Sequence, residues 1–186
     1  KVPERQANMG NFAHLYLLNE GSLSTFPHQL WNQQEGNPLT QLAISGKYDI
    51  SFIFWCLFRA SDVHIESAAI SNEDLDADND FHYVWCVTTK EAALENITTA
   101  CNCLRDVFDS NFKEYMNIVL EGLQKCSYDY IACDFTDIAA MGTPAEMKVD
   151  LQHCMEVARN TEMPTRRKID LILCTSNFTT QNTMIK

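Results

Sequence analysis

Residues 81–105 read FHYVWCVTTKEAALENITTACNCLR, and this stretch decides the fold. Its first part, 81–87, is rich in aromatic and β-branched side chains, which predicts a strand. Thr88 and Glu91 then form a capping box, in which the side chain of each accepts from a free backbone N–H of the other. A helix is therefore expected from this point to about Arg105. Its buried face is expected to consist of Ala93, Ile97, Ala100, Cys101 and Leu104.

Upstream of this stretch the sequence predicts two strands and two helices. The strands are expected at 11–18 and, with a weaker pattern, at 65–70. A short helix is expected over 39–45, closed by Gly46. The apolar run 50–58 suits a buried helix or a buried strand, and we interpret it as a helix because Asp49 can cap it.

Downstream, Thr143-Pro144-Ala145-Glu146 is a second capping box, with proline at the first helical position. The other elements expected there are a helix over 112–125, a strand over 129–135, a short segment over 136–141 and a last strand over 169–174. The helix that starts at Pro144 is expected to end near Asn160. Strands and helices are mixed without a repeat, which predicts a single α+β domain with a mainly antiparallel sheet packed with three to five helices.

The expected domain covers residues 9–178. Met9 resembles a natural initiator, so residues 1–8 are interpreted as an extension that is disordered or foreign to the natural chain. Residues 179–186 are polar and are expected to form a frayed tail. No apolar run is long enough to span a bilayer, and the polar start cannot be the core of a signal peptide.

Charge is the strongest functional signal in the sequence. The chain has 25 acidic residues against 14 basic ones, a formal net charge of −11. Such a surface repels nucleic acids and attracts basic proteins, with which complementary fields raise association rates. Five of the acids crowd residues 71–80: Glu73, Asp74, Asp76, Asp78 and Asp80. The cluster is consistent with a protein contact and equally with a solvated loop that keeps the protein soluble.

The residues that could bind a metal or act as a nucleophile do not have the spacing that known sites require. An EF-hand loop that starts at Asp74 would need glycine and glutamate where the chain has Asn79 and Trp85. His153 and Cys154 are adjacent on a helix, so their side chains diverge. No Cys-x-x-Cys and no glycine-rich phosphate loop occurs. We therefore expect no catalytic residues, no metal site and no cofactor.

The eight cysteines are mostly single residues within apolar runs, which is typical of reduced core residues. This pattern favours a cytoplasmic protein. Trp55 and Trp85 are expected in the core, whereas Trp31, in a polar loop, is the better candidate for an interface anchor. Asp134 and Asp137 are further candidate contact residues.

Three segments carry a family resemblance. Residues 11–16, NFAHLY, resemble the NRSYLY opening of an uncharacterised family of small acidic bacterial proteins. Residues 47–50, KYDI, with the apolar run that follows, resemble its WNYDIPL helix start. Residues 128–138, YDYIACDFTDI, resemble its KYFLLExGEIF strand and turn. The chain departs from the family pattern at Ala13 and His14 in the opening, and at Ser51 and Thr136, where the family has Pro and Gly.

That family is similar to the immunity proteins of bacterial toxin–immunity pairs, which neutralise a cognate toxin in the producing cell. The resemblance implies an immunity protein, and the charge predicts that its acidic surface occludes the cationic active site of a cognate, basic toxin domain. Neither a nucleic acid nor a membrane is an expected partner. Two alternatives remain open: an enzyme whose site is assembled from dispersed residues such as Cys133 or His14, and an adaptor or scaffold domain with a non-toxin protein partner.

Overall fold

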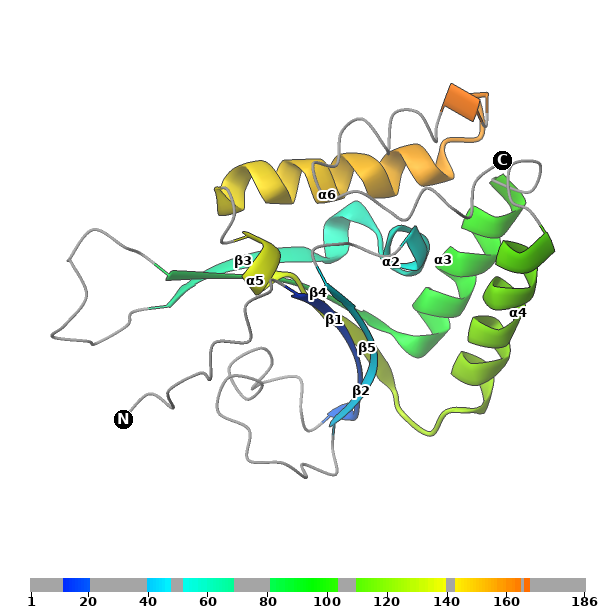
Figure 1. Ribbon diagram of the computed structural model, residues 1–186, viewed down its shortest axis with the longest axis horizontal. Helices are drawn as coiled ribbons and strands as arrows, with labels where there is room; N and C mark the ends of the chain where they lie inside the picture. Colours follow the sequence, from blue (N-terminus) through cyan, green and yellow to red (C-terminus); the bar gives the residue numbers. More distant parts are fainter. Residues whose placement is uncertain are drawn as a thin grey trace, which may run out of the picture.

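The protein is an α+β domain in which helices cover one face of an antiparallel sheet, as Figure 1 shows for the computed structural model. The predicted fold class is confirmed. The structure describes residues 12–20, 40–47, 52–68, 81–103, 110–139, 143–164 and 166–167.

The sheet has five strands in the order β2-β1-β5-β4-β3, and every neighbouring pair is antiparallel. The strands are β1 Phe12–Leu18, β2 Thr40–Lys47, β3 Val63–Ala68, β4 Phe81–Thr89 and β5 Tyr130–Asp134. β5 lies between β1 and β4, so the centre of the sheet joins segments that are far apart in the sequence.

The helices are α2 Phe52–Leu57, α3 Lys90–Cys103, α4 Ser110–Lys125, α5 Thr136–Ala139 and α6 Pro144–Arg159, with a 3-10 turn, η2, at Ala60–Asp62. Helix α6 runs along the sheet, and α2 packs against α3 and α6. Helix α4 packs on α3 at the end of the molecule opposite the loop end of β3 and β4.

The core lies between the sheet and these helices. Leu15, Val84 and Ile131 point from the sheet into a cluster with Trp55 and Phe135, all of them nearly or fully buried. Burying an aliphatic or aromatic side chain of this size stabilises the fold by about 1.5–3 kcal/mol. The expected burial of Trp55 is confirmed.

The second face of the sheet carries a smaller cluster. Leu18 and Ala132 are fully buried there, with Trp85 among the partly buried residues packed on them. Trp85 is thus on the opposite face from the main core, and its ring stacks on His64 with centroids 4.4 Å apart. Trp85 was expected in the core, and it is partly buried against this smaller cluster, because alternation along β4 gives the other face to Val84 and Cys86.

Two predicted elements need correction. The helix predicted over 39–45 is wrong, because this segment is β2 and pairs along its length with β1; sheet pairing overrides weak local helix propensity. The predicted capping box of Thr88 and Glu91 is also wrong, and a simple N-cap one residue later takes its place. Thr88 is still paired with Ile131 in the sheet, and it is Thr89 whose hydroxyl accepts the Ala92 N–H.

Other predicted boundaries are confirmed. Thr143 caps α6 by accepting the Glu146 N–H at 3.3 Å, and its hydroxyl donates to the Glu146 carboxylate at 2.6 Å. Helix α6 ends at Arg159 with Asn160 as its cap. The helix over 50–58 is present as α2, whereas Asp49 and the strand predicted over 169–174 lie outside the described residues.

All seven cysteines within the described residues are present as thiols. Cys86 and Cys133 lie directly opposite each other in β4 and β5 and are fully buried. The Phe135 N–H donates to the Val84 carbonyl, so alternation makes Cys86 and Cys133 a hydrogen-bonded pair. The β-carbons of such a pair are about 5.5 Å apart, which is too far for a disulfide.

Candidate partner-binding surface

The acidic cluster is carried by the connection between two paired strands. Ala68, the last residue of β3, pairs with Phe81, the first residue of β4, so residues 69–80 join the two ends of a hairpin. Glu73, Asp74, Asp76, Asp78 and Asp80 all belong to this connection. The five acids themselves, and Trp31, lie outside the described residues.

The two strands that carry this connection extend past α5 and α6 at one end of the molecule (Figure 1). We call β3, β4 and the connection between them the hairpin arm. On β3, His64, Glu66 and Ser67 are exposed. The Ser67 hydroxyl lies 3.1 Å from Nδ1 of His82 on the paired strand.

Asp134 and Asp137 lie close together, at the end of β5 and in the helix α5 that follows it. Asp134 is paired with Trp85 of β4 and with His14 of β1, and Asp137 follows on α5, which contacts β1 and β4. Asp137 is partly buried. The contact role of Asp137 therefore stays a prediction.

For Asp134 the predicted contact role is wrong, because its side chain is only 6% exposed. The carboxylate accepts the Thr136 backbone N–H at 2.9 Å, which closes the turn from β5 into α5. Burial raises the pKa of Asp134, and hydrogen bonds from the hydroxyl and backbone of Thr136 oppose that rise. Asp134 is thus a buried structural acid.

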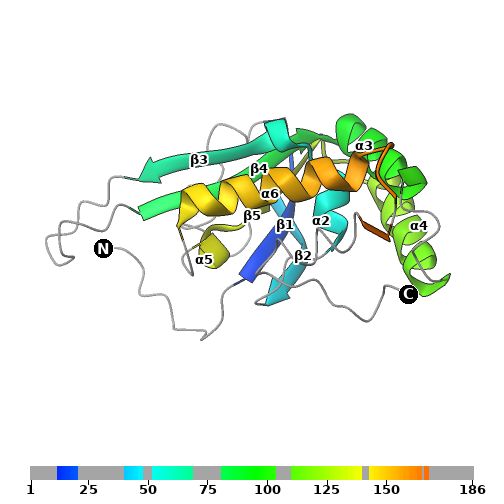
Figure 2. The same cartoon turned by 90° about the horizontal axis from the view of Figure 1, so that it is seen from above.

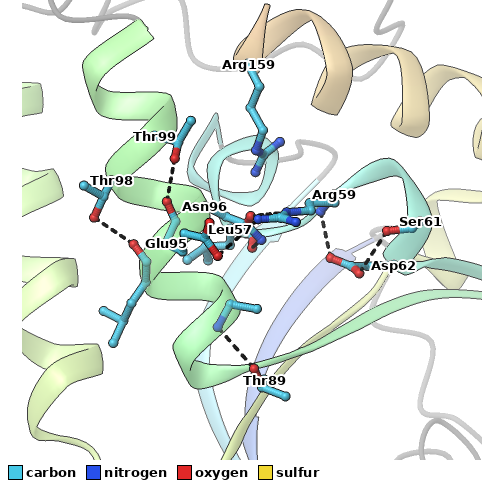
Figure 3. A network of polar contacts seen from close by, with 12 residues as sticks. Leu57, Arg59, Ser61, Asp62, Thr89, Glu95, Asn96, Thr98, Thr99 and Arg159 are labelled. Atoms are coloured by element: carbon cyan, nitrogen blue, oxygen red, sulfur yellow. Dashed lines mark hydrogen bonds and ion pairs between the residues drawn. The ribbon is translucent and has the colours of Figure 1, made fainter.

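The root of β3 is held by side chains from α3 and α6, and Figure 3 labels two of them, Asn96 and Arg159. Asn96 on α3 donates to the Leu57 carbonyl at 2.9 Å, and Arg159 on α6 donates to the Cys56 carbonyl at 2.8 Å. Gln152 on α6 donates to the Ala60 carbonyl at 2.9 Å. We call these contacts the root network, because they fix residues 56–60 immediately before β3.

Arg59 extends the root network to the surface. Its Nε donates to the Asn96 side-chain oxygen at 2.6 Å, and its guanidinium lies 3.3 Å from the Glu95 carboxylate. Its backbone N–H donates to Asp62 at 2.8 Å, within the turn that leads into β3.

The root network supplies hydrogen-bond donors to the carbonyl groups at the end of α2. The last carbonyls of a helix have no partner within the helix, and a buried carbonyl without a donor costs about 1–3 kcal/mol. Asn96 and Arg159 supply donors to two of them. A guanidinium is also favoured at the negative end of a helix. Burial lowers the pKa of Arg159, which is consistent with a cation held mainly by carbonyl dipoles.

The described residues offer little for catalysis. Cys133 is fully buried and burial raises its pKa well above the usual range, whereas a nucleophilic thiol needs exposure and a lowered pKa. Ser67 and His82 are in contact, but among the described residues no carboxylate bonds to His82 to orient its ring. No group of three or more His, Cys, Asp or Glu side chains within the described ranges could hold a metal ion.

Sequence reasoning missed the root network. Asn96 is 1% exposed and lies among Ala93, Ile97 and Ala100 on the buried face of α3. A polar residue at a buried helical position signals a hydrogen-bonded partner, and that signal was available in the sequence. Burial also means that the Asn96-Ile97-Thr98 glycosylation pattern is inaccessible in the folded protein.

Comparison with protein-family models, curated proteins and solved structures found no match to this chain. Within the part of the chain that the structure describes, no helix is long and apolar enough to cross a membrane.

Proposed function

We propose that this chain is a cytoplasmic immunity protein, which binds a cognate bacterial toxin and occludes its cationic active site with the hairpin arm. The carboxylates of the connection occupy the place of anionic substrate groups, such as the phosphates of a nuclease substrate. Asp137 adds charge beside the arm, and Trp31 is the candidate aromatic anchor. The chain acts by binding and performs no chemistry of its own.

The observation that carries this proposal is the pairing of Ala68 with Phe81. It brings the two residues that flank this connection side by side, so that the five acids belong to a single hairpin connection. The root network fixes the strand that leads into that connection, so less orientational freedom is lost when a partner binds. The net charge of −11 further favours a basic partner.

The test is the association rate with the partner, which is first isolated by affinity capture from the native source. The informative variant is Asp74→Lys/Asp76→Lys/Asp78→Lys. Steering by complementary charge raises association rates by about 10–1000-fold. At low salt, we therefore expect this variant to associate at least about tenfold more slowly, with a smaller difference at high salt.

The matched control is Glu114→Lys/Glu156→Lys/Glu162→Lys, which changes the net charge by the same amount. These three residues are exposed and lie on α4 and near the end of α6, at the end of the molecule opposite the loop end of β3 and β4. Equal rates for the two triple variants would show that only net charge matters and would remove the arm from the interface.

The identity of the partner separates the remaining alternatives. A basic protein whose toxic activity is abolished by stoichiometric addition of this chain supports the proposal. A housekeeping complex as the captured partner would favour the adaptor alternative. Substrate turnover by the purified chain would favour the enzyme alternative.

A further inference from the structure

The outer edge of β3 carries backbone groups that point away from the sheet. β3 is an end strand, and among the described strands it pairs only with β4. Because Val84 bonds to β5, the backbone of Trp85 points to β3 and bonds to His64. By alternation, the N–H and C=O groups of Ile65 and Ser67 point outward.

We propose that two copies of this chain associate through their β3 edges, antiparallel, with Ile65 opposite Ile65 of the second copy. The two sheets then form one continuous sheet across a twofold axis. In this register Ile65 exchanges both backbone hydrogen bonds with its counterpart. Each Ser67 N–H meets the outward Val63 carbonyl of the other copy, while the Val63 N–H keeps its bond to Ala60. Every bond uses a group on the outer side of β3 and leaves the pairing with β4 intact.

Side-chain charge selects this register and favours a second copy as the occupant. It places His64 opposite Glu66 of the other copy, twice per dimer, and both side chains are exposed. An imidazole and a carboxylate are complementary neighbours across strands. Centring the axis on Glu66 would oppose the two Glu66 carboxylates. Centring it on His64 would oppose Asp62 and Glu66.

The neighbouring helix supplies an independent observation. Figure 2 shows β3 along the margin of the sheet with α6 beside it. Val149 on α6 is 63% exposed, as is Ile118 on α4. Val149 precedes Gln152 by three residues, and Gln152 bonds to Ala60 at the root of β3, so Val149 lies on the β3 side of α6. The twofold axis brings the two α6 helices toward each other and covers this side chain.

The acidic arms do not oppose this association. The strands run in opposite directions, so the two acidic connections lie at opposite ends of the interface. Ala68 of one copy is about 20 Å from Ala68 of the other, given about 3.3 Å per residue. The Debye length is about 8 Å at physiological ionic strength, so the repulsion between the connections is largely screened. Both acidic connections also stay available to partners.

Sedimentation velocity of the full chain over a range of concentrations tests the proposal, with Ser67→Pro and Ser67→Ala as the matched pair. Ser67 is exposed, and both substitutions remove the hydroxyl contact with His82. Only proline removes the outward N–H, and an edge position tolerates proline. We expect a monomer–dimer equilibrium in the wild-type chain and in Ser67→Ala, and a monomer in Ser67→Pro at the same concentrations.

A charge exchange tests the register. Glu66→Lys places Lys opposite His64 twice, and we expect the dissociation constant of the dimer to rise about tenfold. Adding His64→Glu restores complementary pairs and is expected to recover most of that loss. A wild-type chain that stays monomeric at all concentrations overturns the proposal. So do equal dimer contents in Ser67→Pro and Ser67→Ala, and a double variant that dimerises no better than Glu66→Lys.

Discussion

Replacing Asn96 with alanine tests whether the root network holds the end of α2. The substitution removes the donor to the Leu57 carbonyl and the acceptor for Arg59. The Leu57 carbonyl loses its donor in a buried place, which costs about 1–3 kcal/mol. The Arg59 side chain is 51% exposed and can bond to water instead, so the loss of its hydrogen bond to Asn96 adds little. The small cavity adds about 1 kcal/mol, giving an expected loss of about 2–4 kcal/mol.

Equilibrium unfolding in urea measures this loss. With a slope of about 2 kcal/mol per molar, in the middle of the range for small proteins, the midpoint is expected to fall by about 1–2 M with the slope unchanged. Thr98→Ala is the matched control, because Thr98 lies on the same helix, is exposed, and bonds only to the Leu94 carbonyl one turn earlier. Its effect is expected to stay within about 0.5 kcal/mol. Equal midpoints for the two variants would refute the role assigned to Asn96.

Two further perturbations test single elements. Thr143→Ala removes the N-cap of α6 and is expected to cost about 1 kcal/mol in urea unfolding, whereas exposed Thr161→Ala should cost less than half of that. Asp134→Asn tests the burial of this carboxyl group. Because folding raises the pKa of Asp134, the folded state binds the proton more tightly than the unfolded state does. The wild-type chain therefore loses stability as the pH rises from the ordinary pKa of 3.8 through the raised pKa of the folded state. Across this window the Asn variant should become more stable relative to wild type. The difference between their free energies of unfolding should change by about 1.4 kcal/mol for each pH unit between the two pKa values. A difference that stays constant from pH 4 to 7 would contradict the raised pKa.

Local sequence signals predicted the elements that are specified locally. The cap of α6 follows from Thr143, Pro144 and Glu146, and β4 follows from its aromatic and β-branched run. β2 was predicted as a short helix over 39–45, with Gly46 as the residue that closes it. It is a strand because β1 supplies a partner for its backbone, and this partnership depends on contacts between distant segments.

Asp134 shows a different limit. In the run Ile131, Ala132, Cys133 and Phe135, the alternating faces of a strand give Asp134 the same side as Ala132. Asp134 was a candidate contact residue, and antiparallel sheets commonly have one face in contact with water. The structure instead packs a second cluster there, around Leu18 and Ala132, so both faces of β5 are buried. Only the packing of the whole sheet determines that outcome.

The root network holds the start of β3, and β3 leads into the acidic connection. A variant of the root network can therefore test whether the position of the arm matters while the protein stays folded. Asn96, Arg159 and Gln152 bind the carbonyls of residues 56–60, and β3 begins three residues later at Val63. A variant that loosens this root leaves the acids of the connection unchanged and weakens only the fixed direction of the strand that carries them. Under conditions in which Asn96→Ala remains folded, its association rate with the partner should therefore stay close to that of wild type, because long-range charge sets that rate. Its dissociation rate should rise, because a less ordered arm loses more freedom on binding. The triple-lysine arm variant should instead associate more slowly, and an unchanged dissociation rate in Asn96→Ala would show that the arm binds without help from its root.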